Sequence, residues 1–179
     1  MIYTIIDSPV GDLFASADAA GRITGLQFST ADEGPGSPAS SRMRHPLGAH
    51  RAPGRDPNWT RDERALAPLR GQLEEYFAGE RREFELELAP SGSPFQLSVW
   101  RALCAIPYGE TASYGEIAAA VGQPGAARAV GGANNRNPIA IVIPCHRVIG
   151  ANGTLTGYGG GLPRKQRLLA LETGAQVLV

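Results

Sequence analysis

A continuous apolar run that stops at a proline constrains the fold of this chain more than any other feature. Residues 139–143 (IAIVI) have no polar interruption, which is typical of a strand buried on both faces. Pro144 ends the run, and Gly150 and Gly153 follow soon after, so the chain should bend where the strand becomes a loop. We therefore expect the side chain of Cys145 to lie at the floor of a pocket.

Cys145 stands beside His146, and this pair predicts a reactive thiol. A cysteine attacks as its thiolate, whereas a free thiol is mostly protonated at neutral pH, so reactivity requires a nearby base or cation. The alternative is a small buried cysteine that has a histidine beside it by accident. The dipeptide alone leaves both interpretations open, and the rest of the C-terminal half favours the reactive one.

Length and composition indicate a globular protein with one full core or two small ones. The chain has 179 residues, of which 42% are hydrophobic and 19% are charged. No apolar run approaches the roughly 20 residues of a membrane span, and the N-terminus lacks the basic start of a signal peptide. Two cysteines, one of them beside a histidine, favour a free thiol in a reducing compartment. These features predict a cytoplasmic protein with no membrane partner.

The net charge of zero hides a difference between the two halves of the chain. Residues 1–89 carry 10 basic and 14 acidic side chains, a net charge of −4, whereas residues 90–179 carry 7 basic and 3 acidic ones, a net charge of +4. A modestly basic half tethered to an acidic half favours a polyanionic partner that binds on one face only.

Short β-prone segments separated by turns fill the N-terminal half. Residues 30–60 are rich in Gly, Pro, Ser and Arg, and we expect a loop in which His45 and His50 are solvated rather than metal ligands. Apolar side chains at helical spacing predict an amphipathic helix from Arg61 to Phe77. The predicted strands comprise residues 2–6, 13–17, 23–28 and 84–88.

A change of pattern near residue 90 predicts a boundary between one domain over residues 1–90 and another over residues 91–179. Ser93-Pro94 has the pattern of a helix start, and this helix should carry its apolar side chains on one face. Cys104, near the end of the helix, is therefore expected to be a packed core residue rather than a second reactive thiol.

A helix-turn-helix is predicted in the second domain. Ser113 and Glu116 have the spacing of a capping box, and a turn at residues 122–125 separates their helix from another over residues 126–133. The second helix of such a unit normally faces nucleic acid. Its first turns are almost entirely Ala and Gly apart from Arg128, so the alternative is a tightly packed internal helix. Because a buried arginine needs a counter-ion, we expect Arg128 to be exposed and to point at DNA.

Three motifs of the second domain stand out together: Asn137-Pro138, Pro144-Cys145-His146-Arg147-Val148 and Tyr158-Gly159-Gly160-Gly161-Leu162, supported by residues 106–111, 113–114 and 126–131. They resemble the motifs of the O6-alkylguanine-DNA alkyltransferases, also called methylated-DNA–protein-cysteine methyltransferases. The resemblance covers residues 93–172 with specific motifs, is looser over residues 1–29 and 61–88, and does not extend to residues 30–60.

The resemblance implies an α+β fold, with a small N-terminal α/β domain that is ribonuclease-H-like and a C-terminal winged helix-turn-helix domain. It implies a DNA repair protein that flips O6-alkylguanine, mainly O6-methylguanine, out of double-stranded DNA and transfers the alkyl group irreversibly to Cys145. No cofactor is expected. No metal is expected either, because the zinc site of some relatives needs cysteines and none precedes Cys104. We expect a monomer, and cooperative binding along DNA stays open.

Roles for individual residues follow from the same resemblance. Cys145 would be the nucleophile, and His146 would be its base, acting through a bound water. Glu172, on a helix opened by Pro163, would orient His146, although by sequence alone it would be a solvated carboxylate. Asn137 would brace the turn that holds the active-site strand.

The remaining roles concern the lesion and the duplex. Tyr114 would rotate a phosphate and donate toward the guanine ring nitrogen, and Arg128 would fill the gap in the base stack. Asn134 and Asn135 stand where some relatives have other residues at the pocket edge. The substrate pocket would be lined by Tyr158, Gly159, Gly160 and Val148, and the DNA-binding face would include Ser113, Tyr114, Ala127, Arg128, Ala129 and Gly131.

Two other functions stay open at this point. A winged-helix regulator, in which Cys145 only packs or senses damage, would bind DNA without accepting an alkyl group. A Cys-His hydrolase would turn over many substrate molecules, but such enzymes usually take the nucleophile and the base from separate segments. Alkyl transfer instead yields a thioether, which has no comparable leaving group, so each molecule should react once.

Overall fold

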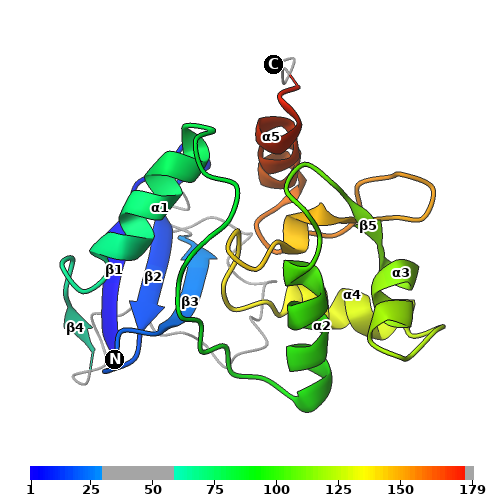
Figure 1. Ribbon diagram of the computed structural model, residues 1–179, viewed down its shortest axis with the longest axis horizontal. Coiled ribbons are helices and arrows are strands. Elements are labelled where there is room, and N and C mark those ends of the chain that lie inside the picture. The colour runs from blue at the N-terminus through cyan, green and yellow to red at the C-terminus, as the bar shows by residue number, and fades with distance from the viewer. Residues whose placement is uncertain (30–58, 176–179) are drawn as a thin grey trace, which may run out of the picture.

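The computed structural model describes residues 1–29 and 59–175, so most of the predicted loop at 30–60, including His45 and His50, lies outside the described residues. The two halves of the chain lie side by side, a sheet with one helix against a group of helices (Figure 1). The elements are β1 Ile2–Ile6, β2 Leu13–Ala17, β3 Ile23–Phe28, β4 Thr60–Arg61, α1 Ala67–Phe77, α2 Pro94–Cys104, β5 Ala112–Ser113, α3 Tyr114–Ala120, α4 Ala127–Asn135, the 3-10 helix η3 Cys145–Arg147, β6 Val148–Ile149 and α5 Leu162–Thr173.

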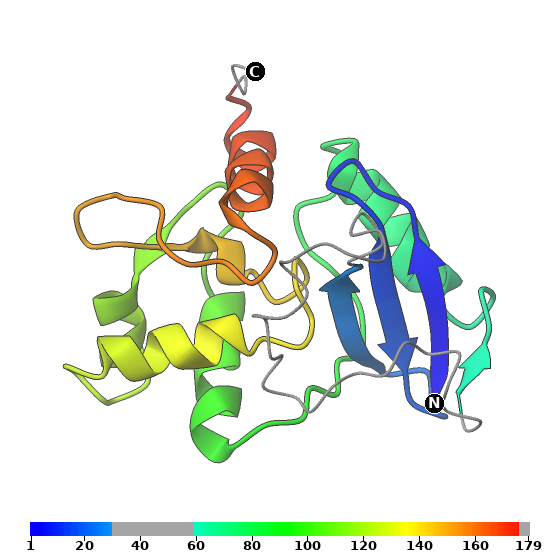
Figure 2. The same ribbon diagram turned by 180° about the vertical axis from the view of Figure 1, so that it is seen from behind.

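The N-terminal sheet has the strand order β3-β2-β1-β4. Strands β1, β2 and β3 pair antiparallel with the bounds that the sequence predicts, and β4 pairs parallel with β1. One face of the sheet is covered by α1, which lies across the strands in both views (Figures 1 and 2). The buried side chains between them include Ile6, Leu13, Ala15, Leu69 and Leu73. This packing gives the N-terminal half an apolar interior.

Helix α1 begins at Ala67, six residues later than predicted. Thr60 and Arg61 pair with β1 as strand β4 instead. The carboxylate of Asp62 then accepts hydrogen bonds from the backbone N–H groups of Arg64 and Ala65, at 2.9 and 3.1 Å. Such a side-chain-to-backbone turn competes with the helix and delays its start.

The strand predicted over residues 84–88 is wrong. Only Leu88 forms a bridge, to Ile23 of β3. The backbone N–H and C=O groups of Glu85 bond instead to the side-chain amide of Gln72 on α1, at 2.8 and 3.0 Å. A helix side chain therefore takes the place of a neighbouring strand.

The helices predicted in the C-terminal half are present. Ser93 and Ser113 cap α2 and α3, each in a full capping box whose third-position partner is Gln96 or Glu116. The indole Nε1 of Trp100 on α2 donates to a backbone carbonyl of α4 at 2.9 Å, which holds these two helices together. The expectation that Cys104 is a core residue is wrong, because it lies one turn after Arg101 on the exposed face of α2.

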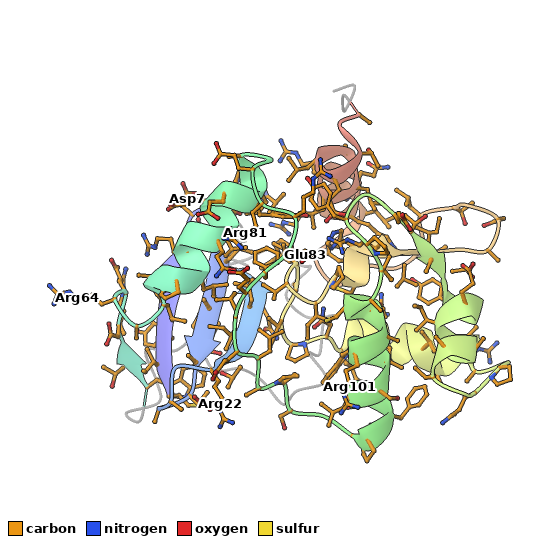
Figure 3. All side chains as sticks on the ribbon, in the orientation of Figure 1. Asp7, Arg22, Arg64, Arg81, Glu83 and Arg101 are labelled. Atoms are coloured by element: carbon orange, nitrogen blue, oxygen red, sulfur yellow. The ribbon has the colours of Figure 1, made fainter. Side chains whose placement is uncertain are left out.

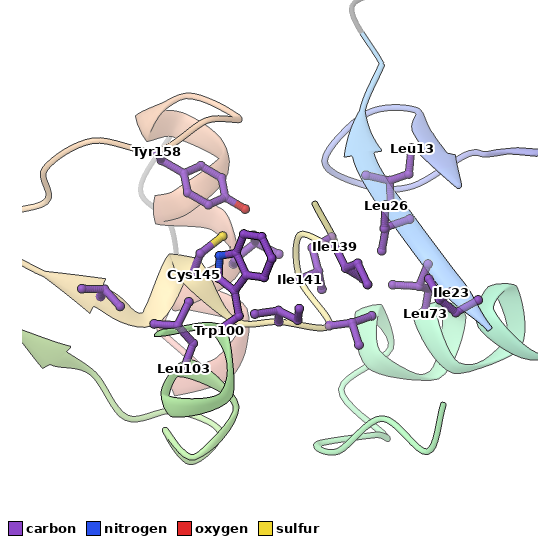
Figure 4. Packing of buried hydrophobic residues seen from close by; sticks show 14 of the residues in the cluster. Leu13, Ile23, Leu26, Leu73, Trp100, Leu103, Ile139, Ile141, Cys145 and Tyr158 are labelled. Carbon is purple, nitrogen blue, oxygen red and sulfur yellow. The ribbon is translucent and has the colours of Figure 1, made fainter. Parts of the chain in front are cut away.

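The predicted strand over residues 139–143 is also wrong, although every residue in the run is buried. Ile139 forms one bridge to Leu26 at the edge of the N-terminal sheet, closed by two backbone hydrogen bonds of 2.8 Å. The chain then turns tightly, with a positive φ of 72° at Ile141. Figure 4 shows this turn between the two halves, which explains why it is buried without being a strand.

None of the helices in the described part of the chain is long and apolar enough to cross a bilayer.

Candidate active site

Cys145 is the first residue of η3 and is 5% exposed. Asn137 fixes the turn that leads to it: its Nδ2 donates to the carbonyl of Ile143 at 2.8 Å, and its Oδ1 accepts from the N–H of Ile139 at 3.0 Å. Asn134, on α4, donates through Nδ2 to the carbonyl of Cys145 at 3.3 Å. Two amide side chains therefore hold the backbone on both sides of the thiol.

His146 and Glu172 form a fully buried pair. The distance between His146 Nε2 and Glu172 Oε1 is 2.7 Å, and neither side chain is exposed. This excludes the alternative of a solvated helix carboxylate at position 172. An ionised carboxylate can only accept, so a neutral His146 donates through Nε2 and keeps its lone pair on Nδ1. Nδ1 has no hydrogen-bond partner among the described residues, which leaves it available as a base.

Two further side chains bind the Glu172 carboxylate, and neither has a role predicted from the sequence. Arg147 donates through Nε to Oε2 at 2.8 Å and through Nη2 to Oε1 at 3.0 Å, while its Nη1 donates to the carbonyl of Ile106. Tyr76, on α1, donates its hydroxyl proton to Oε1 at 2.7 Å. The charged Arg147, directly after the Cys145-His146 pair and an apolar run, was a usable signal, whereas Tyr76 has the spacing of an apolar helix face.

The surroundings set the protonation states of the buried groups. Burial raises the pKa of the Cys145 thiol to about 11, although hydrogen bonding and the Lys165 ammonium oppose this shift. Burial also lowers the pKa of His146 and outweighs the attraction of Glu172. For Glu172, burial raises the pKa, but the hydrogen bonds from His146, Arg147 and Tyr76 outweigh it and bring the pKa to about 2. The resting site at neutral pH therefore holds a neutral thiol, a neutral imidazole and a carboxylate.

Tyr158 forms the wall opposite the thiol. Its hydroxyl end points toward the sulfur of Cys145 in Figure 4, and the residue is 8% exposed. The ring of Phe28, from β3, meets Tyr158 edge-on at 5.9 Å and packs on Gly160 so closely that a Cβ there would lie 2.5 Å from it. Lys165 is fully buried and donates to the carbonyls of Val148 and Thr156. These bonds connect α5 to the loop over residues 150–161, called the pocket loop below.

The predicted DNA-binding residues lie on the helix-turn-helix rather than around the thiol. Arg128 and Ala129 are exposed, and Arg128 has no ion pair within residues 1–29 and 59–175. Ala127, Gly131 and Ser113 are half-buried. Tyr114 connects the two regions, because its hydroxyl donates to the carbonyl of Thr156 in the pocket loop at 3.2 Å.

A hollow of about 290 Å³ lies between the N-terminal half and α5, and one of about 320 Å³ is lined by residues of the N-terminal half. Both are lined by Pro9 and Phe77, and their walls contain neither a cysteine nor a histidine. Cys145 and Tyr158 line neither hollow, so neither hollow is a candidate for thiol chemistry.

Comparison with known proteins identifies the family. The model of the 6-O-methylguanine DNA methyltransferase, DNA binding domain, matches residues 94–174, and that of the ribonuclease-like domain of the same methyltransferase matches residues 1–90. A methylated-DNA–protein-cysteine methyltransferase of Methanosarcina acetivorans is 47% identical over 172 residues, 96% of this chain and 98% of that protein. One from Mycolicibacterium paratuberculosis is 69% identical over 114 residues, 64% of this chain and 69% of that protein.

A solved structure is similar over nearly the whole chain. The crystal structure of Mycobacterium tuberculosis OGT in complex with DNA is 48% identical, with a TM-score of 0.79, and the match covers 97% of this chain and 94% of that one. The chain therefore belongs to the family of methylated-DNA–protein-cysteine methyltransferases, which repair DNA by direct alkyl transfer. This confirms the resemblance and the two-part α+β fold that it implies.

Proposed function

We propose that this protein repairs O6-alkylguanine by moving the alkyl group to Cys145. His146 Nδ1 takes the thiol proton, directly or through one water, and the thiolate attacks the alkyl carbon. A C–S bond forms as the C–O6 bond breaks, and the electron pair stays on the guanine. Tyr114 donates a proton to the guanine ring nitrogen, and the proton held by His146 restores the tyrosine hydroxyl through solvent. Overall the thiol proton ends on guanine, and a thioether remains on the protein.

The observation that supports this proposal best is the buried hydrogen bond between Glu172 and His146, the neighbour of Cys145 in η3. A carboxylate that fixes the tautomer of a histidine beside a thiol is the arrangement of an activated nucleophile. The thiol pKa of about 11 means that the resting protein holds little thiolate. Deprotonation therefore accompanies binding of the lesion, which protects the resting thiol from other electrophiles.

Duplex DNA is the partner we propose for the helix-turn-helix. The M. tuberculosis relative was crystallised in complex with DNA. In this chain, α4 presents Ala and Gly with the exposed Arg128, a surface that suits close approach to a minor groove. Arg128 occupies the gap left when the target base is flipped out. We also propose that the protein acts as a monomer in the cytoplasm.

Transfer of a labelled methyl group from duplex O6-methylguanine tests the proposed function. We expect about one label per protein molecule, no label on Cys145→Ser, and full labelling of Cys104→Ser, the matched control with an exposed thiol. Labelling that persists in Cys145→Ser would refute the site. Release of label with repeated turnover would favour the hydrolase alternative, and DNA binding without labelling would favour the regulator.

Arg128→Ala separates base flipping from chemistry. We expect about a hundredfold slower repair of duplex DNA, because unstacking a base costs a few kcal/mol and 1.4 kcal/mol corresponds to a factor of ten. The rate with free O6-benzylguanine should not change, since this substrate needs no extrusion. Equal losses on both substrates would contradict the role of Arg128.

A further inference from the structure

Tyr76 brings the N-terminal half into direct contact with the buried His146–Glu172 pair of the C-terminal half. It lies in the last turn of α1, fully buried, and its hydroxyl donates to Glu172 Oε1 at 2.7 Å across 96 positions of sequence. The same oxygen is 2.7 Å from Nε2 of His146. Arg147 Nη2 also donates to this oxygen, at 3.0 Å, so Oε1 accepts from three donors, of which only Tyr76 comes from the N-terminal half.

The tyrosine is held rigidly and is always a donor. Its ring contacts the rings of Phe77, Phe84 and Tyr108, with centroids 5.3, 5.4 and 6.1 Å away. Burial and the neighbouring Glu172 carboxylate raise the pKa of Tyr76 far above its ordinary value. The hydroxyl is therefore protonated at neutral pH and donates to the carboxylate.

We propose that Tyr76 is a positioning residue for alkyl transfer: it fixes the Glu172 carboxylate and limits how strongly that carboxylate attracts a proton to His146. This inference rests on the proposed function of the Cys145 site. It gives the N-terminal half, which has no reacting group of its own, a part in setting the reaction rate.

The physical basis is competition among donors for one negative charge. The Glu172 carboxylate accepts two hydrogen bonds from Arg147 and one each from Tyr76, His146 and the backbone N–H of Gly109. Each donor withdraws charge from the oxygens and weakens their attraction for the others. Without the tyrosine proton, Oε1 would hold the imidazolium form of His146 more tightly, and the carboxylate would be free to rotate.

Other ionisable groups surround the His146–Glu172 pair, and Tyr76→Phe leaves their side chains chemically unaltered. They come from the loop after α2, from η3, from the pocket loop and from α5, and they are Tyr108, Arg147, Cys145, Tyr158 and Lys165. A change in pH dependence on removing one oxygen from Tyr76 therefore reports the hydrogen bond to Glu172.

The test is the pH dependence of the reaction between the full-length protein and free O6-benzylguanine, compared for the parent, Tyr76→Phe and Tyr108→Phe. For Tyr76→Phe we expect the rate constant at pH 7 to fall about three- to tenfold and the acid limb to move up by about half a pH unit. Affinity for unmodified duplex DNA should not change. Tyr108→Phe is the matched control, because its hydroxyl only reaches the carbonyl of Leu171 at 3.5 Å.

Loss of packing is distinguished by a second pair of variants. Leu73→Val loosens the same helix without contacting Glu172, and its acid limb should coincide with that of the parent. 3-Fluorotyrosine at position 76 keeps the ring and the hydroxyl but is a stronger donor, so it should move the acid limb to lower pH. This substitution also carries the test if Tyr76→Phe does not fold.

Two outcomes overturn the inference while the parent protein still accepts the benzyl group. One is that Tyr76→Phe and Tyr108→Phe give the same rate and the same acid limb. The other is that fluorotyrosine leaves the acid limb where it is. A parent protein that takes up no benzyl group at all contradicts the proposed function instead, so the two failures are distinguishable.

Discussion

The two halves of this protein build their interiors from different side chains. In the N-terminal half, the buried residues are apolar apart from the hydroxyls of Thr4, Ser16 and Tyr76. Charged side chains of this half, such as Arg22 and Arg64, project outward (Figure 3). The interior of the C-terminal half instead contains buried ionisable and amide groups: Asn134, Asn137, His146, Arg147, Lys165 and Glu172.

This difference indicates that the two halves are stabilised in different ways. Apolar burial stabilises by roughly 25 cal/mol per Å² and tolerates small changes of shape. Buried ions are weak sources of net stability, because desolvation offsets their attraction, but they fix geometry when every partner is present. The stability of the C-terminal half therefore depends on every hydrogen-bond partner of Glu172 being present. The stability of the N-terminal half depends on how well apolar side chains fill its interior.

Glu172→Gln should have the largest effect, because it removes the charge that partners both His146 and Arg147. We expect a loss of about 3–5 kcal/mol in the free energy of unfolding, since Arg147 stays buried without a counter-ion. Alkyl transfer should slow by about a hundredfold or more, the usual contribution of a positioned base. Denaturant unfolding and O6-benzylguanine kinetics measure both quantities.

The control for this variant is Glu110→Gln, which removes the same charge from an exposed position of the same half. It should change the free energy of unfolding by less than about 0.5 kcal/mol. A wild-type transfer rate in folded Glu172→Gln would show that the carboxylate has no part in the reaction.

Leu69→Ala examines the apolar interior. Leu69, on α1, is completely buried. Its truncation should lower the free energy of unfolding by about 2–5 kcal/mol. The rate of alkyl transfer per folded molecule should stay the same, because the cavity lies in the half without a reacting group. A rate that falls as steeply as in Glu172→Gln would erase the distinction between the two interiors.

Acid should act on the C-terminal half first. The ordinary pKa of Glu172 is 4.5 and its folded value is about 2, so its contribution is complete above pH 4.5 and is lost as the pH falls toward 2. His146 acts in the same direction, because its folded pKa is also lowered and the unfolded chain binds its proton more readily. From pH 5 to pH 3 the Glu172 contribution alone should decrease by about 2 kcal/mol.

Hydrogen exchange measured over this pH range checks the acid prediction. Amides of α5, which carries Glu172, should lose protection before those of β2, whose half of the chain has its ionic pairs, such as Asp18–Arg22, at the surface. Loss of protection in β2 at a higher pH than in α5 would contradict the comparison.

Local signals explain which parts of the fold could be predicted from the sequence. Strands β1 to β3 follow from alternation between turns, and α2 and α3 follow from their serine caps. The failures are set by tertiary partners: residues 139–143 are buried in a tight turn, and in residues 84–88 a helix side chain takes the place of a strand neighbour. Cys104 was misplaced because the phase of a short helix is uncertain by one residue.

The residues of the candidate site also differ in how far the sequence predicts them. Cys145, His146 and Asn137 lie within one short segment, so their proximity follows from the sequence, and a family resemblance was enough to add Glu172. The hydroxyl of Tyr76 could not be found by pattern, because its spacing from Leu69 and Leu73 is that of an apolar helix face. Only the contact between α1 and α5 in the folded protein shows that this hydroxyl donates to the Glu172 carboxylate.

The most direct test of the central claim, that Cys145 is the alkyl acceptor, is intact-mass measurement followed by peptide mapping after mixing with O6-methylguanine duplex. We predict a gain of one methyl group per chain, located on the peptide that contains Cys145, and no gain with unmethylated duplex. An unchanged mass, or a methyl group found on Cys104, would contradict the account.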